Sequence, residues 1–258
     1  MRQYQSFSYR NSNFRLCSAR LDLMTAEIVR QRELLEQYIL LQPQFRTALA
    51  PIGLLPGAPP IAERMAAAAV QTGVGPLAAV AGAIAQAAAE AALSGGAAEA
   101  IVENGGDLYL ASPQPLRVGI YAGPGSAFNC LAFEFTPEQL PLSLCSSSSL
   151  LGHSLSFGRC QLASVLAKDA SLADAAATLA GNLVRCAADI DPALAQLLRI
   201  PGVQGAVIIC EEKIGLGGDL PRLCRQDSRA SIDLVTRDKF SNFPSRSSNP
   251  AGVMPQHN

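Results

Sequence analysis

A short polar corner separates two apolar runs near the middle of the chain. It reads Asn104-Gly105-Gly106-Asp107. A Gly-Gly pair between Asn and Asp is typical of the tight turn of a β-hairpin. Glycine also permits positive φ and lets a ligand approach the backbone closely. The corner is therefore either a plain hairpin turn or a surface that binds a planar or phosphorylated ligand.

A serine-rich segment follows the apolar run that ends at Cys145, and Gly152-His153 comes shortly after it. The four consecutive serines are Ser146, Ser147, Ser148 and Ser149. Hydroxyls and free backbone N–H groups can bind an anion, and histidine can shuttle a proton near neutral pH. The other histidine of the chain, His257, lies next to its last residue, which excludes a histidine-rich metal site. The alternative is a plain serine loop beside a structural histidine.

A third polar segment, Ser171-Leu-Ala-Asp174, opens an apolar helical pattern. Ser-x-x-Asp resembles a capping box, and a carboxylate in the first helical turn is favoured by the helix dipole. Asp174 and Thr178 are four residues apart, so they share one helical face. A carboxylate and a hydroxyl are hard oxygen ligands, and Mg²⁺ needs few of them because it keeps waters. Capping and magnesium binding are compatible roles for this segment.

A weaker signal is Thr72-Gly73-Val-Gly75, which precedes a helical pattern. A glycine-rich helix start can cradle a phosphate. The segment lacks the lysine and the spacing of a P-loop, so the alternative is a simple break between two helices.

Composition excludes several classes of protein. The chain has 258 residues, of which 49% are hydrophobic and 16% charged, with a net charge of -1. No basic stripe is present, so we expect no nucleic-acid partner. The seven cysteines are scattered without a CxxC motif, which fits neither a disulfide framework nor a zinc site and predicts core thiols in a reducing compartment. The weakly charged, apolar composition is compatible with a homodimer.

The apolar stretch over residues 65–93 is interrupted by Gln71, Pro76, Gln86 and Glu90 and consists largely of alanine. It falls short of a clean membrane span, so we expect a buried central helix and no membrane contact. The N-terminal residues have no apolar signal-peptide region, which predicts a cytoplasmic protein.

Periodicity and turn residues predict the elements that position these segments. We expect helices at residues 25–41 (capped by Thr25), 61–70, 76–93 and 172–188, and one or two helical turns within 192–198. We expect strands at residues 4–9, 14–21, 100–103, 108–110, 117–121, 131–135, 142–145, 161–167, 203–210 and 213–216. Runs of strands with helices between them indicate an α+β fold. We read residues 1–235 as one domain and residues 236–258 as a flexible tail.

Four segments together resemble the ApbE superfamily, and more closely its smaller cytoplasmic branch. They are Gly73-Val-Gly-Pro76 before an Ala-rich helix, residues 101–110, Gly152-His-Ser-Leu-Ser-Phe-Gly158 and Leu172-Ala-Asp-Ala-Ala-Ala-Thr178. The resemblance implies antiparallel, T-fold-like sheets packed around a buried Ala-rich central helix. It also implies FAD:protein FMN transferase chemistry, in which Mg²⁺ helps cleave the FAD pyrophosphate and FMN is attached to a Thr of a target protein.

Residue by residue, the resemblance assigns the glycine turn Asn104–Asp107 to the flavin site and His153 to the family's motif histidine. It makes Asp174 and Thr178 the metal ligands. Two departures accompany it: residues 72–83 contain no lysine, and Ser154-Leu-Ser156 follows the histidine where the family usually has Asp-Pro.

Three hypotheses stay open at this point. The first is a Mg²⁺-dependent enzyme acting on FAD or another nucleotide-like phosphate. The second, implied by the association of the smaller branch with sulfide assimilation and homocysteine formation, is a sulfur-handling protein that uses Cys145. Its alternative is that Cys145 is a buried strand residue. The third is a non-enzymatic protein that binds a small-molecule ligand and has lost the chemistry.

Overall fold

Two antiparallel sheets and one group of helices make up the part of the chain that the computed structural model describes, residues 2–148 and 160–225. The large sheet has the order β1-β2-β3-β4-β7-β8-β9-β10, with β1 (Gln5–Tyr9), β2 (Ser12–Ser18), β3 (Ala100–Asn104), β4 (Asp107–Ala111), β7 (Leu142–Ser147), β8 (Leu162–Ala167), β9 (Val203–Cys210) and β10 (Lys213–Gly218). The small sheet has the order β11-β6-β5, with β11 (Arg222–Arg225), β6 (Leu131–Phe135) and β5 (Leu116–Gly119).

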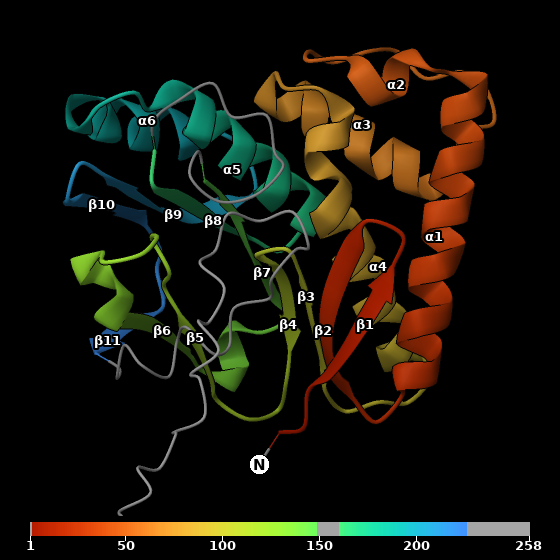
Figure 1. Cartoon of the computed structure of the whole chain (residues 1–258), viewed down its shortest axis with the longest axis horizontal. Coiled ribbons are helices and arrows are strands. Elements are labelled where there is room, and N and C mark those ends of the chain that lie inside the picture. Colours follow the sequence, from red (N-terminus) through yellow and green to blue (C-terminus); the bar gives the residue numbers. More distant parts are fainter. Residues whose placement is uncertain (1, 149–159, 226–258) are drawn as a thin grey trace, which may run out of the picture.

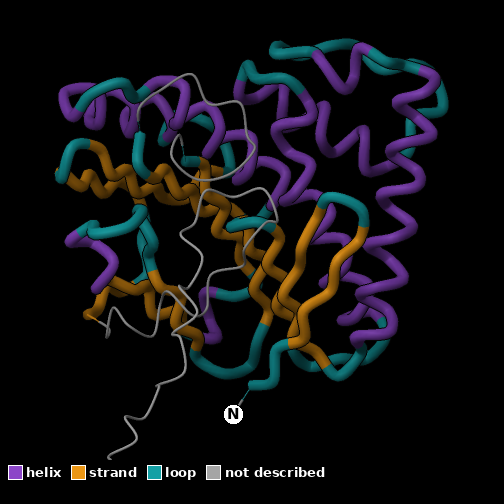
Figure 2. The backbone as a smooth tube through the Cα atoms, in the orientation of Figure 1, coloured by secondary structure: helices purple, strands orange, loops and turns teal. Residues whose placement is uncertain are grey.

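The helices gather on one side of the large sheet, and the small sheet lies on the other (Figure 1, Figure 2). They are α1 (Leu21–Leu41), α2 (Gln44–Thr47), α3 (Pro60–Thr72), α4 (Val80–Ser94), α5 (Ala170–Leu183) and α6 (Ile190–Leu197). Short 3₁₀ turns are η1 (Pro76–Ala79), η2 (Ala127–Cys130), η3 (Pro137–Gln139) and η4 (Ala187–Asp189). The predicted α+β class is confirmed.

Alternation along the strands divides the core into two apolar clusters. In β8, Ala163 and Val165 belong to the cluster on the helix side, whereas Leu162 and Leu166 belong to the cluster between the sheets. Successive strand residues point to opposite faces, so one strand supplies both cores. The small side chains on the helix side let α5 approach closely, and its alanines from Ala173 to Ala180 are fully buried.

Helix α4 is the predicted Ala-rich central helix. It packs against α1, α5 and β3 (Figure 1). A Cβ at Gly82 would lie 2.2 Å from the Ala170 carbonyl oxygen, so glycine is what allows α5 to come this close. The segment Pro76–Ser94 is long and apolar enough to cross a membrane by composition, with a mean hydropathy of 1.5. Its packing is that of an interior helix, and the absence of membrane contact stays a prediction.

Several predicted boundaries move. Helix α1 begins at Leu21 rather than at a Thr25 cap, and the Thr25 hydroxyl donates to the Leu21 carbonyl within the helix. The first hairpin turns at Arg10, whose φ is 54°, because β2 already begins at Ser12. Helix α5 is shorter than predicted, since Val184 adopts extended backbone. The predicted tail, residues 236–258, lies outside the described residues, and the domain boundary at residue 235 stays a prediction.

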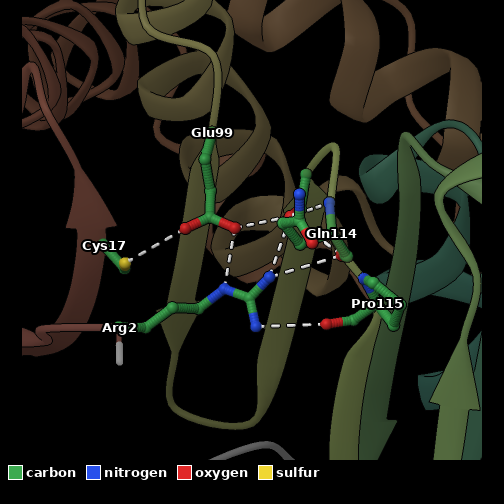
Figure 3. Close-up of polar contacts among 6 residues, drawn as sticks. Arg2, Cys17, Glu99, Gln114 and Pro115 are labelled. Carbon is green, nitrogen blue, oxygen red and sulfur yellow. Dashed lines mark hydrogen bonds and ion pairs between the residues drawn. The ribbon is translucent and has the colours of Figure 1, made fainter.

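The N-terminal residues are tied to the base of the β3–β4 hairpin by Arg2 (Figure 3). Its guanidinium pairs with Glu99 at 2.7 Å and donates to the Ser112 hydroxyl at 3.0 Å and the Pro115 carbonyl at 3.1 Å. These contacts lie at the end of the hairpin opposite to its polar corner, so they brace the strands that carry the corner.

Candidate functional site

The polar corner is a two-residue hairpin turn between β3 and β4. Asn104 pairs with Asp107 in the ladder, and Gly105 and Gly106 connect them with φ of 66° and 106°. Two successive positive φ values favour glycine, which explains the Gly-Gly pair. The side chains of Asn104 and Asp107 are buried, so the corner turns its polar groups into the protein.

Both side chains fasten the corner to neighbouring elements. The Asn104 side-chain amide donates to the Ala81 carbonyl in the first turn of α4 at 3.2 Å. One Asp107 carboxylate oxygen accepts a hydrogen bond from the Ser146 N–H near the end of β7 at 3.1 Å. The hairpin corner, the start of the central helix and the end of β7 therefore meet at one place.

Asp174 reaches the same place from α5. Its carboxylate accepts a hydrogen bond from the Gly82 N–H at 2.9 Å, one residue after the carbonyl that binds Asn104. Thr178 lies one turn further along the same helical face and is buried. The structure thus brings Asp107 and Asp174 to the N-terminal end of α4 from two different elements.

The predicted capping role of Ser171 is wrong. Asp169 is the N-cap of α5, and its carboxylate accepts from the N–H groups of Ser171 at 2.8 Å and Leu172 at 3.2 Å. An Asp one residue before the helix provides this acceptor better than a Ser already inside the first turn. Consequently the Ser171 hydroxyl, which is 0% exposed, is left without a hydrogen-bond partner.

Burial governs the ionisation of the two carboxyls. It raises the pKa of Asp107 to about 7, although the hydrogen bond from the Ser146 N–H opposes the rise. Burial also raises the pKa of Asp174 well above its usual range, and the negative charge of Asp107 raises it further. The hydrogen bond from the Gly82 N–H opposes that rise. The two carboxyls are therefore close enough to repel each other when both are ionised.

Cys145 is a buried strand residue of β7. Its side chain is 0% exposed, and its sulfur lies 3.6 Å from the Ala170 carbonyl oxygen, to which the thiol donates. Burial raises the pKa of the thiol well above its ordinary value, and the charges of Asp107 and Asp174 add to that rise. A sulfur carrier needs an accessible thiolate. The sulfur-handling hypothesis gains no support from this environment and stays a prediction.

The serine run continues β7 rather than forming a loop at once. The Ser146 hydroxyl hydrogen-bonds the Ser164 hydroxyl at 2.8 Å, and the Ser148 hydroxyl donates to the Gln161 carbonyl at 2.6 Å. The Ser147 hydroxyl is buried without a partner. Of the other predicted ligand-binding or catalytic residues in this region, Ser149, Gly152 and His153 lie outside the described residues.

Gly73 and Gly75 mark a break between two helices, which is the alternative that the sequence left open. Gly73 ends α3 with a φ of 75°. A Cβ at Gly75 would lie 1.7 Å from the Ala48 carbonyl oxygen, so close backbone packing requires glycine there. Their phosphate-binding role stays a prediction.

Sequence reasoning missed Gly82 and Ala81, whose backbone groups orient Asp174 and Asn104. The available signal was a glycine within an otherwise alanine-rich helix. Within residues 2–148 and 160–225, no group of three or more His, Cys, Asp and Glu side chains could hold a metal ion. A magnesium site does not require such a group, because Mg²⁺ keeps waters and uses one or two carboxylates.

Comparison with known proteins identifies relatives over most of the chain. The model of a family described as AbpE bacteria matches residues 17–216. A UPF0280 protein of Methanocella arvoryzae is 43% identical over 198 residues, which cover 77% of this chain and 80% of the relative. A UPF0280 protein of Methanothrix thermoacetophila is 40% identical, over 84% of this chain and 90% of the relative.

Solved structures share the fold at low sequence identity. The flavin transferase ApbE from Vibrio cholerae superposes with a TM-score of 0.54 and 12% identity, covering 85% of this chain and 97% of that one. The apbe protein from Thermotoga maritima gives a TM-score of 0.51 and 13% identity, covering 92% and 100%. At such identity the likeness concerns the fold, and it confirms the predicted ApbE-like architecture.

Proposed function

This chain belongs to the AbpE bacteria family within the ApbE-like superfamily, and on that premise we propose that it is a Mg²⁺-dependent enzyme acting on FAD or a similar nucleotide phosphate. Asp174 and Thr178 would hold the cation. The Asn104–Asp107 corner would bind the ring system, and the segment from Ser146 to His153 would bind the phosphates.

One observation carries this proposal: two buried carboxyls, Asp107 and Asp174, lie where the β3–β4 hairpin, β7, α4 and α5 converge. Burying a carboxylate without a compensating charge is costly, so the pKa of the carboxyl rises and its neutral form is favoured. The groups that shift these two pKa values are carboxyls, a thiol and backbone amides rather than cationic side chains. A divalent cation would stabilise the ionised forms of Asp107 and Asp174, so the arrangement suits cation binding.

The oxygen donors of the site suit a hard cation. Asp174 offers a carboxylate fixed in orientation by the Gly82 N–H, and Thr178 offers a hydroxyl one turn away. When bound, Mg²⁺ would supply Lewis acidity and neutralise charge on a phosphate. The absence of lysine in residues 72–83 leaves this task to the cation.

The remaining contributions come from the chain itself. The Ser147 hydroxyl is the one described member of the serine run without a protein partner, so it can hydrogen-bond a phosphate oxygen. The exposed Gly105 has open space where a Cβ would be, so a planar ring can approach its backbone. A target protein, a homodimeric state and a cytoplasmic location stay predictions.

The proposal is tested by titrating the protein with FAD, with and without Mg²⁺, while flavin fluorescence is followed. We expect binding that requires Mg²⁺ and that Asp174→Asn abolishes. Asp169→Asn is the matched control, because it changes the N-cap carboxylate of the same helix and Asn also caps helices. FAD binding that does not require Mg²⁺ and is not weakened by Asp174→Asn would refute the metal-dependent function. Mg²⁺-dependent binding without any FAD cleavage would instead favour the non-enzymatic alternative.

A further inference from the structure

We infer that Asp107 is a second carboxylate ligand of the cation that Asp174 and Thr178 hold, so that one divalent ion joins the β3–β4 hairpin to α5. The inference rests on the proposed function. It assigns Asp107 a role distinct from the flavin-ring contact that the sequence resemblance gives to its turn.

Strand β7 connects Asp107 with α5. Leu108 pairs with Leu144, and continuing this antiparallel register by one residue places Asp107 opposite Cys145. The Cys145 sulfur lies 3.6 Å from the carbonyl oxygen of Ala170, one helical turn before Asp174. Asp107 is thus brought to the part of α5 that carries Asp174.

Helix α4 makes a second connection between Asp107 and Asp174. Asn104 pairs with Asp107 across the hairpin and donates to the Ala81 carbonyl. The next residue, Gly82, donates its N–H to the Asp174 carboxylate. Asp107 therefore lies between Asn104 on β3 and Cys145 on β7. The side chains of both contact backbone groups close to Asp174.

Serine hydroxyls without protein partners lie on β7 and α5, the two elements that approach Asp107 and Asp174. Three buried serine hydroxyls of the described residues have no hydrogen-bond partner: Ser143, Ser147 and Ser171. Ser143 and Ser147 alternate with Cys145 along β7 and share its face, which is turned toward α5. Ser171 lies three residues before Asp174 on the same helical side. Buried polar groups are normally satisfied, and the water shell of a cation supplies donors that would satisfy these hydroxyls.

Charge balance supports the same assignment. Two carboxylates balance the charge of one divalent ion, whereas Asp174 alone would leave a positive charge in a buried place. Asp107 would accordingly tighten cation binding even before a phosphate arrives.

The experiment measures Mn²⁺ binding, with Mn²⁺ standing in for Mg²⁺, by the loss of the electron paramagnetic resonance signal of free Mn²⁺. Titrations are run on the full chain with and without FAD. Asp107→Asn and Asp174→Asn are each expected to weaken Mn²⁺ binding by at least about tenfold, whereas Asp169→Asn leaves it unchanged. The Asn side chain keeps an acceptor for the Ser146 N–H, and circular dichroism checks that each variant is folded.

The outcomes separate the two proposals. If Asp174→Asn loses Mn²⁺ while Asp107→Asn binds it like the unmodified protein, Asp107 is no ligand, and the proposed function stands. If the unmodified protein binds no Mn²⁺ with or without FAD, or if both variants bind as it does, the inference and the proposed metal site fail together.

Discussion

Replacing Asp107 by Asn should stabilise the metal-free protein at neutral and basic pH. Burial raises the pKa of this carboxyl from 3.8 to about 7 in the folded state. A carboxyl with a raised folded-state pKa imposes no penalty below its unfolded pKa. Its penalty grows as the pH rises and is complete above the folded pKa. Asn is neutral throughout, so it removes a penalty that exists only above about pH 4.

The magnitude follows from the two pKa values. Each pKa unit corresponds to about 1.4 kcal/mol, so the full penalty is roughly 4 kcal/mol at pH 8. Between pH 5 and pH 8 it grows by roughly 2–3 kcal/mol. The Ser146 N–H bonds an amide oxygen less strongly than a carboxylate, which offsets about 1 kcal/mol. We expect a net gain of about 3 kcal/mol at pH 8.

Urea unfolding in the presence of a chelator at pH 5 and pH 8 measures this effect. The unmodified protein should lose free energy of unfolding between these pH values, and Asp107→Asn should lose roughly 2–3 kcal/mol less. Asp169→Asn is the matched control for the loss of a carboxylate, because that residue is exposed and Asn also caps helices. A destabilised Asp107→Asn at pH 8, or a variant with unchanged pH dependence, would show that burial does not raise the pKa of Asp107.

Three further predictions concern neighbouring residues. Gly82→Ala should lower the free energy of unfolding in urea by about 3 kcal/mol or more, because its Cβ would lie 2.2 Å from the Ala170 carbonyl oxygen and 3.0 Å from the Asp174 Cβ. A change within about 0.5 kcal/mol, as for a neutral surface substitution, would contradict the close helix packing. Thr178→Val should weaken Mg²⁺-dependent FAD binding by about tenfold while the circular dichroism spectrum is unchanged, whereas full affinity would remove Thr178 from the metal site. Cys145 should resist thiol reagents at pH 8 in the folded protein, since burial raises its pKa, while the partly exposed Cys130 reacts. Peptide mapping by mass spectrometry compares the two cysteines. Rapid labelling of Cys145 would support the sulfur-carrier hypothesis.

Local signals in the sequence predicted the elements that their own residues determine. The tight turn needs two positive φ values, which the Gly105-Gly106 pair permits. Its hairpin could therefore be predicted without tertiary information. The alanine-rich run after Pro76 similarly predicted a helix that is packed on several sides. The beginnings of α1 and α5 were mispredicted because side chains that form caps in isolation, Thr25 and Ser171, are used differently once the helices pack.

The sequence selected candidate residues for the site but not their assembly. Helical spacing selected Asp174 and Thr178, and turn chemistry selected Asp107; their roles stay predictions. Their convergence depends on Gly82 letting α5 approach α4 and on the β4–β7 register, which are long-range contacts that no local pattern encodes. The raised pKa values follow from that burial, so they too were beyond a reading of the sequence.

The most direct test of the account is a crystal structure of the protein grown with Mn²⁺ and FAD, with the anomalous signal of manganese recorded. We predict one manganese ion about 2.1–2.2 Å from oxygens of Asp107, Asp174 and Thr178 and in contact with the FAD pyrophosphate. A manganese ion bound elsewhere, or FAD bound with no ion beside Asp174, would contradict the proposed metal-dependent function.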